Sequence, residues 1–215
     1  MNTRNFAQDT MSDLKLHRLS EITANGFDAL LYDCDGTLAD NMHLHKAAFV
    51  QTARQHGFEL DPSILDEMAG VPTVGVAEEI LRRYAVSFDP VLFAQQKSQT
   101  FVDEYLPQTK PLDFVLEHLK LNAGKKRIAV VSGGRKSTVS KTLALLQIDN
   151  LVEVLVCAED TLRGKPFPDP FLLAAERFGV APERCMVFED GNPGVAAAKA
   201  AGMSWVRVDQ ISGEQ

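Results

Sequence analysis

The chain has 215 residues, 45% of them hydrophobic and 24% charged, and these ordinary values exclude disorder over its whole length. A net charge of -7 argues against a broad basic surface for nucleic acid, and no run approaches the roughly 20 apolar residues of a membrane span. The first residues, Met-Asn-Thr-Arg-Asn, contain no apolar segment of a secretory signal. We expect a cytoplasmic monomer without a nucleic-acid or membrane partner.

Residues 1–26 are predicted to form an N-terminal extension that contains a short amphipathic helix. Apolar residues recur there at a spacing of three, as Met11 with Leu14 and Leu19 with Ile22. The segment precedes the first strand-like run, so we expect it to pack loosely on the surface.

The apolar run from Phe27 to Tyr32 has the length and composition of a buried parallel strand. Asp33 and Asp35 follow it directly, and residues two apart on an extended backbone point to the same side. In an open α/β sheet, ligands bind at the carboxyl ends of the strands. Gly36 then allows a sharp turn. The acidic pair therefore suits a divalent cation and phosphate chemistry.

Residues 39–107 are helical in pattern and contain no strand signal. Helices are predicted to open at Asp61-Pro62 and Asp89-Pro90, where Asp caps the helix and Pro occupies its first turn. Two apolar stripes with helical spacing are Met42, His45, Phe49, Thr52 and His56, and Val74, Ala77, Leu81 and Tyr84. We predict an inserted α-helical bundle, a cap domain that can act as a lid.

Residues 27–38 and 108–215 are predicted to form an α/β core, because strand and helix patterns alternate along the second half. Strands are predicted at 127–131, 154–157, 185–188 and 205–208. Helices are predicted between them, opening after Ser132-Gly133-Gly134, at Asp169-Pro170 and at Asn192-Pro193. The fold class is therefore a Rossmann-like, doubly wound parallel sheet.

Polar clusters follow the predicted strands, and the shared edge of a parallel sheet brings such clusters together. Ser132 precedes a helix, whose free N–H groups and positive dipole end suit an anion. Lys165 precedes a segment in which every second residue is proline, which stiffens the backbone. Glu189 and Asp190 offer carboxylate oxygens, the ligands that hard cations such as Mg²⁺ take.

In order, these clusters resemble the four motifs of the haloacid dehalogenase superfamily of phosphohydrolases. The matching residues are Asp33-Cys34-Asp35-Gly36-Thr37-Leu38, Ser132, Lys165-Pro166-Phe167-Pro168-Asp169 and Glu189-Asp190. The fourth motif departs from the family's common Glu-Asp-Ser, because Gly191 occupies the place of the serine.

The resemblance implies that Asp33 attacks phosphorus to form an aspartyl phosphate, while Asp35 protonates the leaving alkoxide and then activates water. Ser132 and Lys165 are implied to hold the phosphoryl group, and Mg²⁺ is the implied cofactor. Its implied ligands are Asp33, the Asp35 carbonyl, Asp190 and, less directly, Glu189. The implied substrate-binding residues are Thr37, His45, Thr73, Gly133 and Arg135. We expect burial beneath a closed cap to raise the pKa of Asp35.

Gly70-Val71-Pro72-Thr73 resembles the substrate-facing cap loop of the β-phosphoglucomutase-like branch of the superfamily. Members with mutase activity place an arginine where this loop ends in Thr73. We therefore predict a magnesium-dependent phosphatase for a small sugar phosphate.

Two other activities stay open. One is a β-phosphoglucomutase-type mutase, with Arg135 or Lys136 meeting a second phosphate, and the other is a phosphoglycolate-type phosphatase. His45 is either close to the substrate or a packing residue of its helix.

Overall fold

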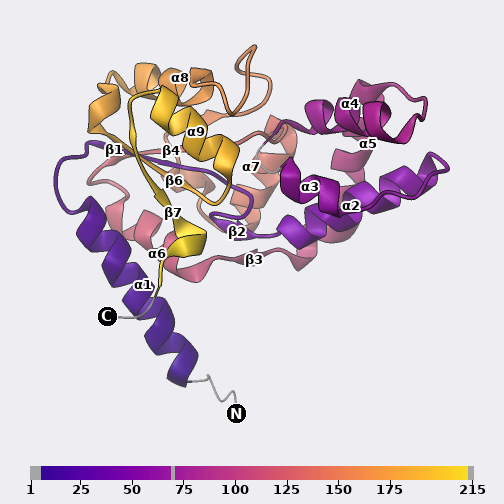
Figure 1. The fold of residues 1–215 in the computed structure, drawn as a ribbon. Helices are drawn as coiled ribbons and strands as arrows, with labels where there is room; N and C mark the ends of the chain where they lie inside the picture. Colours follow the sequence, from indigo (N-terminus) through magenta and orange to yellow (C-terminus); the bar gives the residue numbers. More distant parts are fainter. Residues whose placement is uncertain (1–5, 69–70, 213–215) are drawn as a thin grey trace.

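The computed structural model describes residues 6–68 and 71–212 and consists of an α/β core beside a smaller group of helices (Figure 1). The core sheet has five parallel strands in the order β5-β4-β1-β6-β7. The strands are β1 (Ala29–Tyr32), β4 (Arg127–Val131), β5 (Val154–Val156), β6 (Cys185–Glu189) and β7 (Ser204–Arg207). The predicted doubly wound α/β fold is confirmed.

Helices cover both faces of this sheet, because alternate residues of each buried strand point to opposite faces. Leu30 and Tyr32 of β1 face α6 (Asp113–Asn122) and α7 (Lys136–Leu145). Ala29 and Leu31 face α8 (Asp169–Phe178) and α9 (Asn192–Ala200). All four β1 side chains are buried, which places the strand that precedes Asp33 at the centre of the core.

The N-terminal helix α1 (Phe6–Thr23) is longer and better anchored than we predicted. Its C-terminal half packs beside α6, where Leu19 is fully buried and belongs to the same hydrophobic cluster as β1. Thr23 is also buried, and its Oγ1 lies 2.8 Å from Nε2 of His118. The expectation of a loose surface segment was therefore wrong for this half of the helix, because its apolar spacing continues into the core.

His118 is fully buried and links α1 to β1 through two hydrogen bonds. The Thr23 hydroxyl donates to the Leu19 carbonyl, so it accepts from His118 Nε2–H. His118 Nδ1 then accepts from the Tyr32 hydroxyl at 2.9 Å. Burial, with help from the charge of Lys126, lowers the pKa of His118 to about 4. The network therefore needs a neutral imidazole.

We expect this histidine to make the fold sensitive to mild acid. Between the ordinary pKa of 6.5 and the folded value of about 4, only the unfolded chain binds the proton, so stability falls as the pH falls. At pH 5 the lowered pKa of His118 reduces the free energy of unfolding by about 2 kcal/mol. Urea unfolding at pH 7 and pH 5 should show a smaller loss for His118→Gln than for the parent. Equal losses in both proteins would contradict this account.

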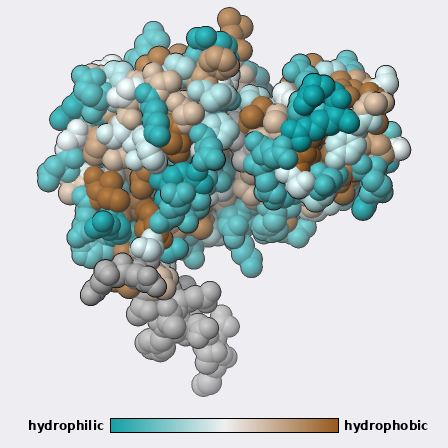
Figure 2. Space-filling model, in the orientation of Figure 1, coloured by the Kyte–Doolittle hydropathy of each residue, from teal (hydrophilic) through white to brown (hydrophobic). Residues whose placement is uncertain are grey.

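The helical insertion, residues 42–108, lies between two short strands and has a hydrophobic core of its own. Its elements are α2 (Met42–Gln55), α3 (Ser63–Glu67), α4 (Thr73–Tyr84), α5 (Pro90–Thr100), a π-helix (Phe101–Tyr105) and a 3₁₀ helix (Leu106–Gln108). As predicted, Asp89 caps α5, its carboxylate accepting from the N–H groups of Val91 and Leu92 at 2.8 and 3.1 Å. Figure 2 shows core and insertion as two lobes with much hydrophilic surface.

One predicted stripe of the insertion is only partly right. The residues of α4 that are buried in the insertion's core are Val76, Ala77 and Ile80, whereas Val74 and Leu81 are only partly covered. The buried face of α4 is therefore rotated relative to the predicted stripe. It is set by the packing of α4 against α5, and the sequence does not show which helix α4 packs against. Within the described residues, no helix combines the length and apolar character needed to cross a membrane.

A two-stranded antiparallel ribbon joins core and insertion. It pairs β2 (Ala39–Asp40) with β3 (Lys110–Pro111), so the chain leaves and re-enters the core at one place. The sequence contained no signal for this ribbon, because two-residue strands show no periodicity and their pairing joins segments far apart in the chain. The insertion extends from these two strands, which we call the hinge.

Candidate active site

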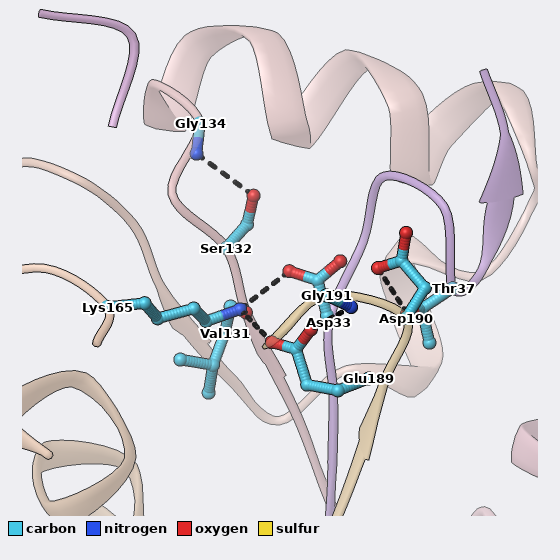
Figure 3. A network of polar contacts seen from close by, with 9 residues as sticks. All are labelled: Asp33, Thr37, Val131, Ser132, Gly134, Lys165, Glu189, Asp190 and Gly191. Atoms are coloured by element: carbon cyan, nitrogen blue, oxygen red, sulfur yellow. Dashed lines mark hydrogen bonds and ion pairs between the residues drawn. The ribbon is translucent and has the colours of Figure 1, made fainter. Parts of the chain in front are cut away.

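The predicted acidic and basic residues meet at the carboxyl edge of the sheet (Figure 3). Asp33 follows β1, Ser132 follows β4, and Glu189 ends β6. The backbone N–H of Asp33 donates to the Phe188 carbonyl at 2.9 Å, which continues the β1–β6 ladder into the site. Parallel pairing of β1 with both β4 and β6 thus brings together residues more than 150 positions apart.

Lys165 is buried at the centre of these groups, with 3% of its surface exposed. Its Nζ donates to Asp33 Oδ1 at 2.7 Å, to Glu189 Oε1 at 2.5 Å and to the Val131 carbonyl at 2.9 Å. Burial lowers the pKa of this lysine, but the charges of Asp33 and Glu189 outweigh that effect and raise it well above its usual range. Lys165 is therefore a permanent cation beside Asp33.

Three carboxylates surround this single cation. Asp33, Glu189 and Asp190 each place an oxygen within 4.8 Å of the others. Burial, together with the charge of Glu189, raises the pKa of Asp33 and raises that of Asp190 to about 6. Such an excess of negative charge on hard oxygen ligands fits a divalent cation such as Mg²⁺. The residues present therefore fit the predicted Mg²⁺ cofactor.

Gly36 and Thr37 place Asp190 in this group. Gly36 has φ 91°, in the left-handed region, and a Cβ on it would lie 2.1 Å from Asp190 Oδ2. The Thr37 hydroxyl donates to Asp190 Oδ1 at 3.4 Å. Thr37, predicted to contact the substrate, thus contacts a carboxylate of the acidic group.

Asp35 has a different environment from the one we expected. Burial does raise its pKa, but the hydrogen bonds from His45 and from the amide of Asn41, together with the charge of Lys97, outweigh burial and lower the pKa below its ordinary value. Asn41 Nδ2 lies 2.7 Å and His45 Nε2 lies 3.1 Å from Asp35 Oδ1. The predicted upward shift was wrong, because the insertion brings hydrogen-bond donors as well as apolar surface.

Lys97 is a site residue that the sequence reasoning missed. This lysine of α5 is buried, and its Nζ donates to His45 Nδ1 at 2.6 Å, which leaves His45 Nε2–H to donate to Asp35. Burial lowers the pKa of Lys97 to about 8. A signal existed, since Lys97 lies four residues from Phe93 and from Phe101, on the apolar face of its helix.

A pocket with an empty volume of about 750 Å³, including its open mouth, lies between the core and the insertion. Most of its insertion side is apolar, formed by Met42, Phe49, Leu65, Met68, Val71 and Val76. Its core side contains Asp33, Asp35, Ser132, Gly133, Gly134, Glu189 and Asp190. The acids thus face a largely apolar surface of the insertion across the pocket.

Only some of the predicted substrate-binding residues line this pocket. His45, Thr73 and Gly133 line it. Arg135 does not line it, and its Nε lies 3.9 Å from Glu159 Oε1. Gly70 of the loop that ends in Thr73 lies outside the described residues.

A doubly wound sheet with a buried Asp–Lys pair and an acidic group at its carboxyl edge has the chemistry of an α/β protein that acts on phosphate groups. The family model of haloacid dehalogenase-like hydrolases matches residues 30–208. The chain is 32% identical over 182 residues to the fructose-1-phosphate phosphatase YqaB of Escherichia coli (strain K12), covering 85% of this chain and 96% of that protein.

Two further comparisons agree with this match. Hexitol phosphatase A of Escherichia coli (strain K12) is 31% identical over 191 residues, covering 83% of this chain and 82% of that protein. A hydrolase from Pseudomonas syringae superposes with a TM-score of 0.76 at 22% identity, covering 87% of this chain and 86% of that one. The chain therefore belongs to the haloacid dehalogenase-like hydrolases, and it is a phosphatase of that family.

Proposed function

We propose that this phosphatase hydrolyses a small sugar phosphate, with Mg²⁺ as cofactor and an aspartyl phosphate on Asp33 as intermediate. The observation that carries the proposal is the buried Asp33–Lys165 pair at a pocket whose opposite side is formed by the helical insertion. Two relatives named for phosphatases of fructose 1-phosphate and of hexitol phosphates support the substrate class. The insertion acts as a cap in this proposal.

In the first step an Asp33 carboxylate oxygen attacks phosphorus, and the bond from phosphorus to the leaving alkoxide oxygen breaks. The charge and hydrogen bond of Lys165 favour the ionised form of Asp33 against the effect of burial, and Lys165 faces the charge that develops on the phosphoryl oxygens. When bound by Asp33, Asp190 and the Asp35 carbonyl, with Glu189 beside them, Mg²⁺ offsets the negative charge shared by carboxylates and phosphate. The Ser132 hydroxyl and the N–H groups of its loop hold the phosphoryl group.

Asp35 handles the protons of both steps. Its lowered pKa means that Asp35 is ionised in the structure, so its carboxylate is available to accept a proton from the water that attacks the aspartyl phosphate. The leaving alkoxide of the first step needs a proton on Asp35. His45 relays it in one concerted step, in which Lys97 gives a proton to His45 Nδ1 while the Nε2 proton passes to Asp35 Oδ1, 3.1 Å away, so that Lys97 is left neutral and no imidazolate forms.

Asp35→Asn is expected to lower kcat for a sugar phosphate by about 10²–10⁴-fold, the usual contribution of general acid and base catalysis. With p-nitrophenyl phosphate, whose leaving group needs little protonation, the variant should release one p-nitrophenolate per enzyme rapidly and then turn over slowly. Stopped-flow absorbance measures both phases. A near-parental steady-state rate would rule out the role of Asp35.

Chelation of divalent cations is expected to abolish activity, and added Mg²⁺ is expected to restore it, because three acids then face one lysine. Asp190→Ala should raise the Mg²⁺ concentration for half-maximal rate more than Glu189→Gln does, since Lys165 already engages Glu189. Titration of the rate with Mg²⁺ measures both values. Full activity after exhaustive chelation would refute a metal-dependent reaction.

A screen of fructose 1-phosphate, hexitol phosphates and phosphoglycolate tests the substrate class. We expect kcat/KM to be highest for a sugar or hexitol phosphate. A clear preference for phosphoglycolate would replace this substrate class with the phosphoglycolate-type alternative.

One observation keeps a phosphosugar mutase as a second candidate. Lys46 lines the pocket from the insertion, where a second phosphate would lie, although it is ion-paired with Asp66. Hydrolysis remains the proposal, because neither predicted anchor, Arg135 or Lys136, lines the pocket. Incubation with β-glucose 1-phosphate and a trace of glucose 1,6-bisphosphate decides between them. Rapid glucose 6-phosphate formation with little free phosphate would establish the mutase.

A further inference from the structure

Gly164, immediately before Lys165, touches the helical insertion. A Cβ on Gly164 would lie 2.6 Å from Cγ and 3.2 Å from Cδ of Pro72. The first distance is too short for two carbon atoms, so the segments meet this closely only because residue 164 has no side chain. The φ of Gly164 lies outside the left-handed region, so the position requires a small residue and not an unusual backbone.

The loop that carries Gly164 is braced from within. Arg163 donates to both carboxylate oxygens of Asp169 at 3.0 Å, and its guanidinium lies 4.8 Å from the centre of the Phe167 ring. The Phe167 N–H donates to the Gly164 carbonyl at 3.0 Å. Lys165, the next residue, is held by its three buried hydrogen bonds. These contacts hold the loop on the core side of the Gly164–Pro72 contact in place.

On the other side, Pro72 directly precedes α4, and its neighbours Val71 and Thr73 both line the pocket. A shift of Pro72 therefore moves two residues of the pocket wall. In Figure 1 the loop before α8 lies at the top of the view, whereas the hinge strands β2 and β3 lie lower, near its middle. The contact thus lies away from the hinge about which the insertion would rotate.

We propose that Gly164 and Pro72 form a steric stop that sets how far the insertion closes over the pocket, and that this stop determines which leaving groups fit. The proposal rests on the proposed function, in which the insertion acts as a cap over the phosphorylated substrate. Gly164 and Pro72 are specificity-determining residues and take no part in the chemical step. Because Gly164 has no side chain, the insertion comes close enough to the acids to contact a small sugar before Pro72 meets the core.

A rescue experiment tests the stop. Gly164→Ala should hold the insertion away from the core and lower kcat/KM for fructose 1-phosphate by roughly 10- to 100-fold, the scale expected for a misplacement of about 1 Å. Pro72→Ala removes Cγ and Cδ, so the double variant should regain most of the loss. Leu162→Ala, at a fully exposed residue of the same loop, is the matched control and should match the parent.

A second readout needs no turnover. Hydrogen exchange of the backbone amides at the start of α4 should be faster in Gly164→Ala than in the parent and should return to the parental rate in the double variant. If the parent hydrolyses no sugar phosphate, the proposed function fails, while the exchange rates still test the contact. Parental exchange in Gly164→Ala, or a loss that Pro72→Ala does not rescue, would overturn the stop, since the latter shows an effect acting through Lys165 alone.

Discussion

Asp33→Asn is expected to abolish turnover, lowering kcat by about 10⁴-fold or more, because an amide cannot act as the nucleophile that forms the phosphoryl intermediate. The protein should remain folded. The substitution removes one of three crowded carboxylate charges, and Lys165 keeps its bonds to Glu189 and to the Val131 carbonyl. The free energy of unfolding should therefore be no lower than in the parent.

Phosphate release from p-nitrophenyl phosphate and from fructose 1-phosphate, measured beside urea unfolding, checks both expectations. Asp149→Asn, at an exposed residue distant in sequence from the site, is the matched control and should keep the parental rate. A folded Asp33→Asn protein with more than a few per cent of parental activity would show that another group is the nucleophile.

Lys165→Met is expected to have the second largest effect. Cations that face the transferred phosphoryl group in enzymes contribute roughly 10³–10⁵-fold to the rate. The variant should also be less stable by about 3 kcal/mol at pH 7, since removing one partner of a buried ionic group leaves charge without compensation. Asp33 and Glu189 would then be buried acids that have lost the cation to which both are hydrogen-bonded.

The stability loss of this variant should shrink as the pH falls. Without the lysine, whose charge lowers the pKa of Asp33, burial raises the folded-state pKa of Asp33 further above its unfolded value. The variant is then closest to the parent in stability at low pH, where the acid is protonated in both the folded and the unfolded chain, and it loses stability as the pH rises. Unfolding at pH 5 and pH 7, with exposed Lys141→Met as control, measures this change. A loss that is independent of pH would mean that Lys165 contributes by packing and not by charge.

The sequence by itself determined the sheet and its chemical edge. Strands such as β4 and β6 lie in apolar runs of β-rich composition bounded by Gly, Pro or polar residues, and these local patterns are sufficient to locate buried parallel strands. Parallel strands share one carboxyl edge, so Asp33, Lys165 and Glu189 could be placed together before any contact was known. Their order along the chain then identified the family.

Only the tertiary structure decided what surrounds these groups. Lys97 reaches the site because α5 packs against α2, which brings its Nζ to His45, and no spacing along the chain encodes that distance. The pKa of Asp35 is the sum of burial and of hydrogen bonds from Asn41 and His45, and these opposing contributions cannot be weighed without coordinates.

The same reason explains the hinge and the stop. The hinge pairs residues 39–40 with 110–111, and the stop pairs residue 72 with residue 164. Each depends on the angle at which one independently packed group of helices lies against the sheet. Local propensity carries no information about that angle, because it is set by contacts between segments far apart in the chain.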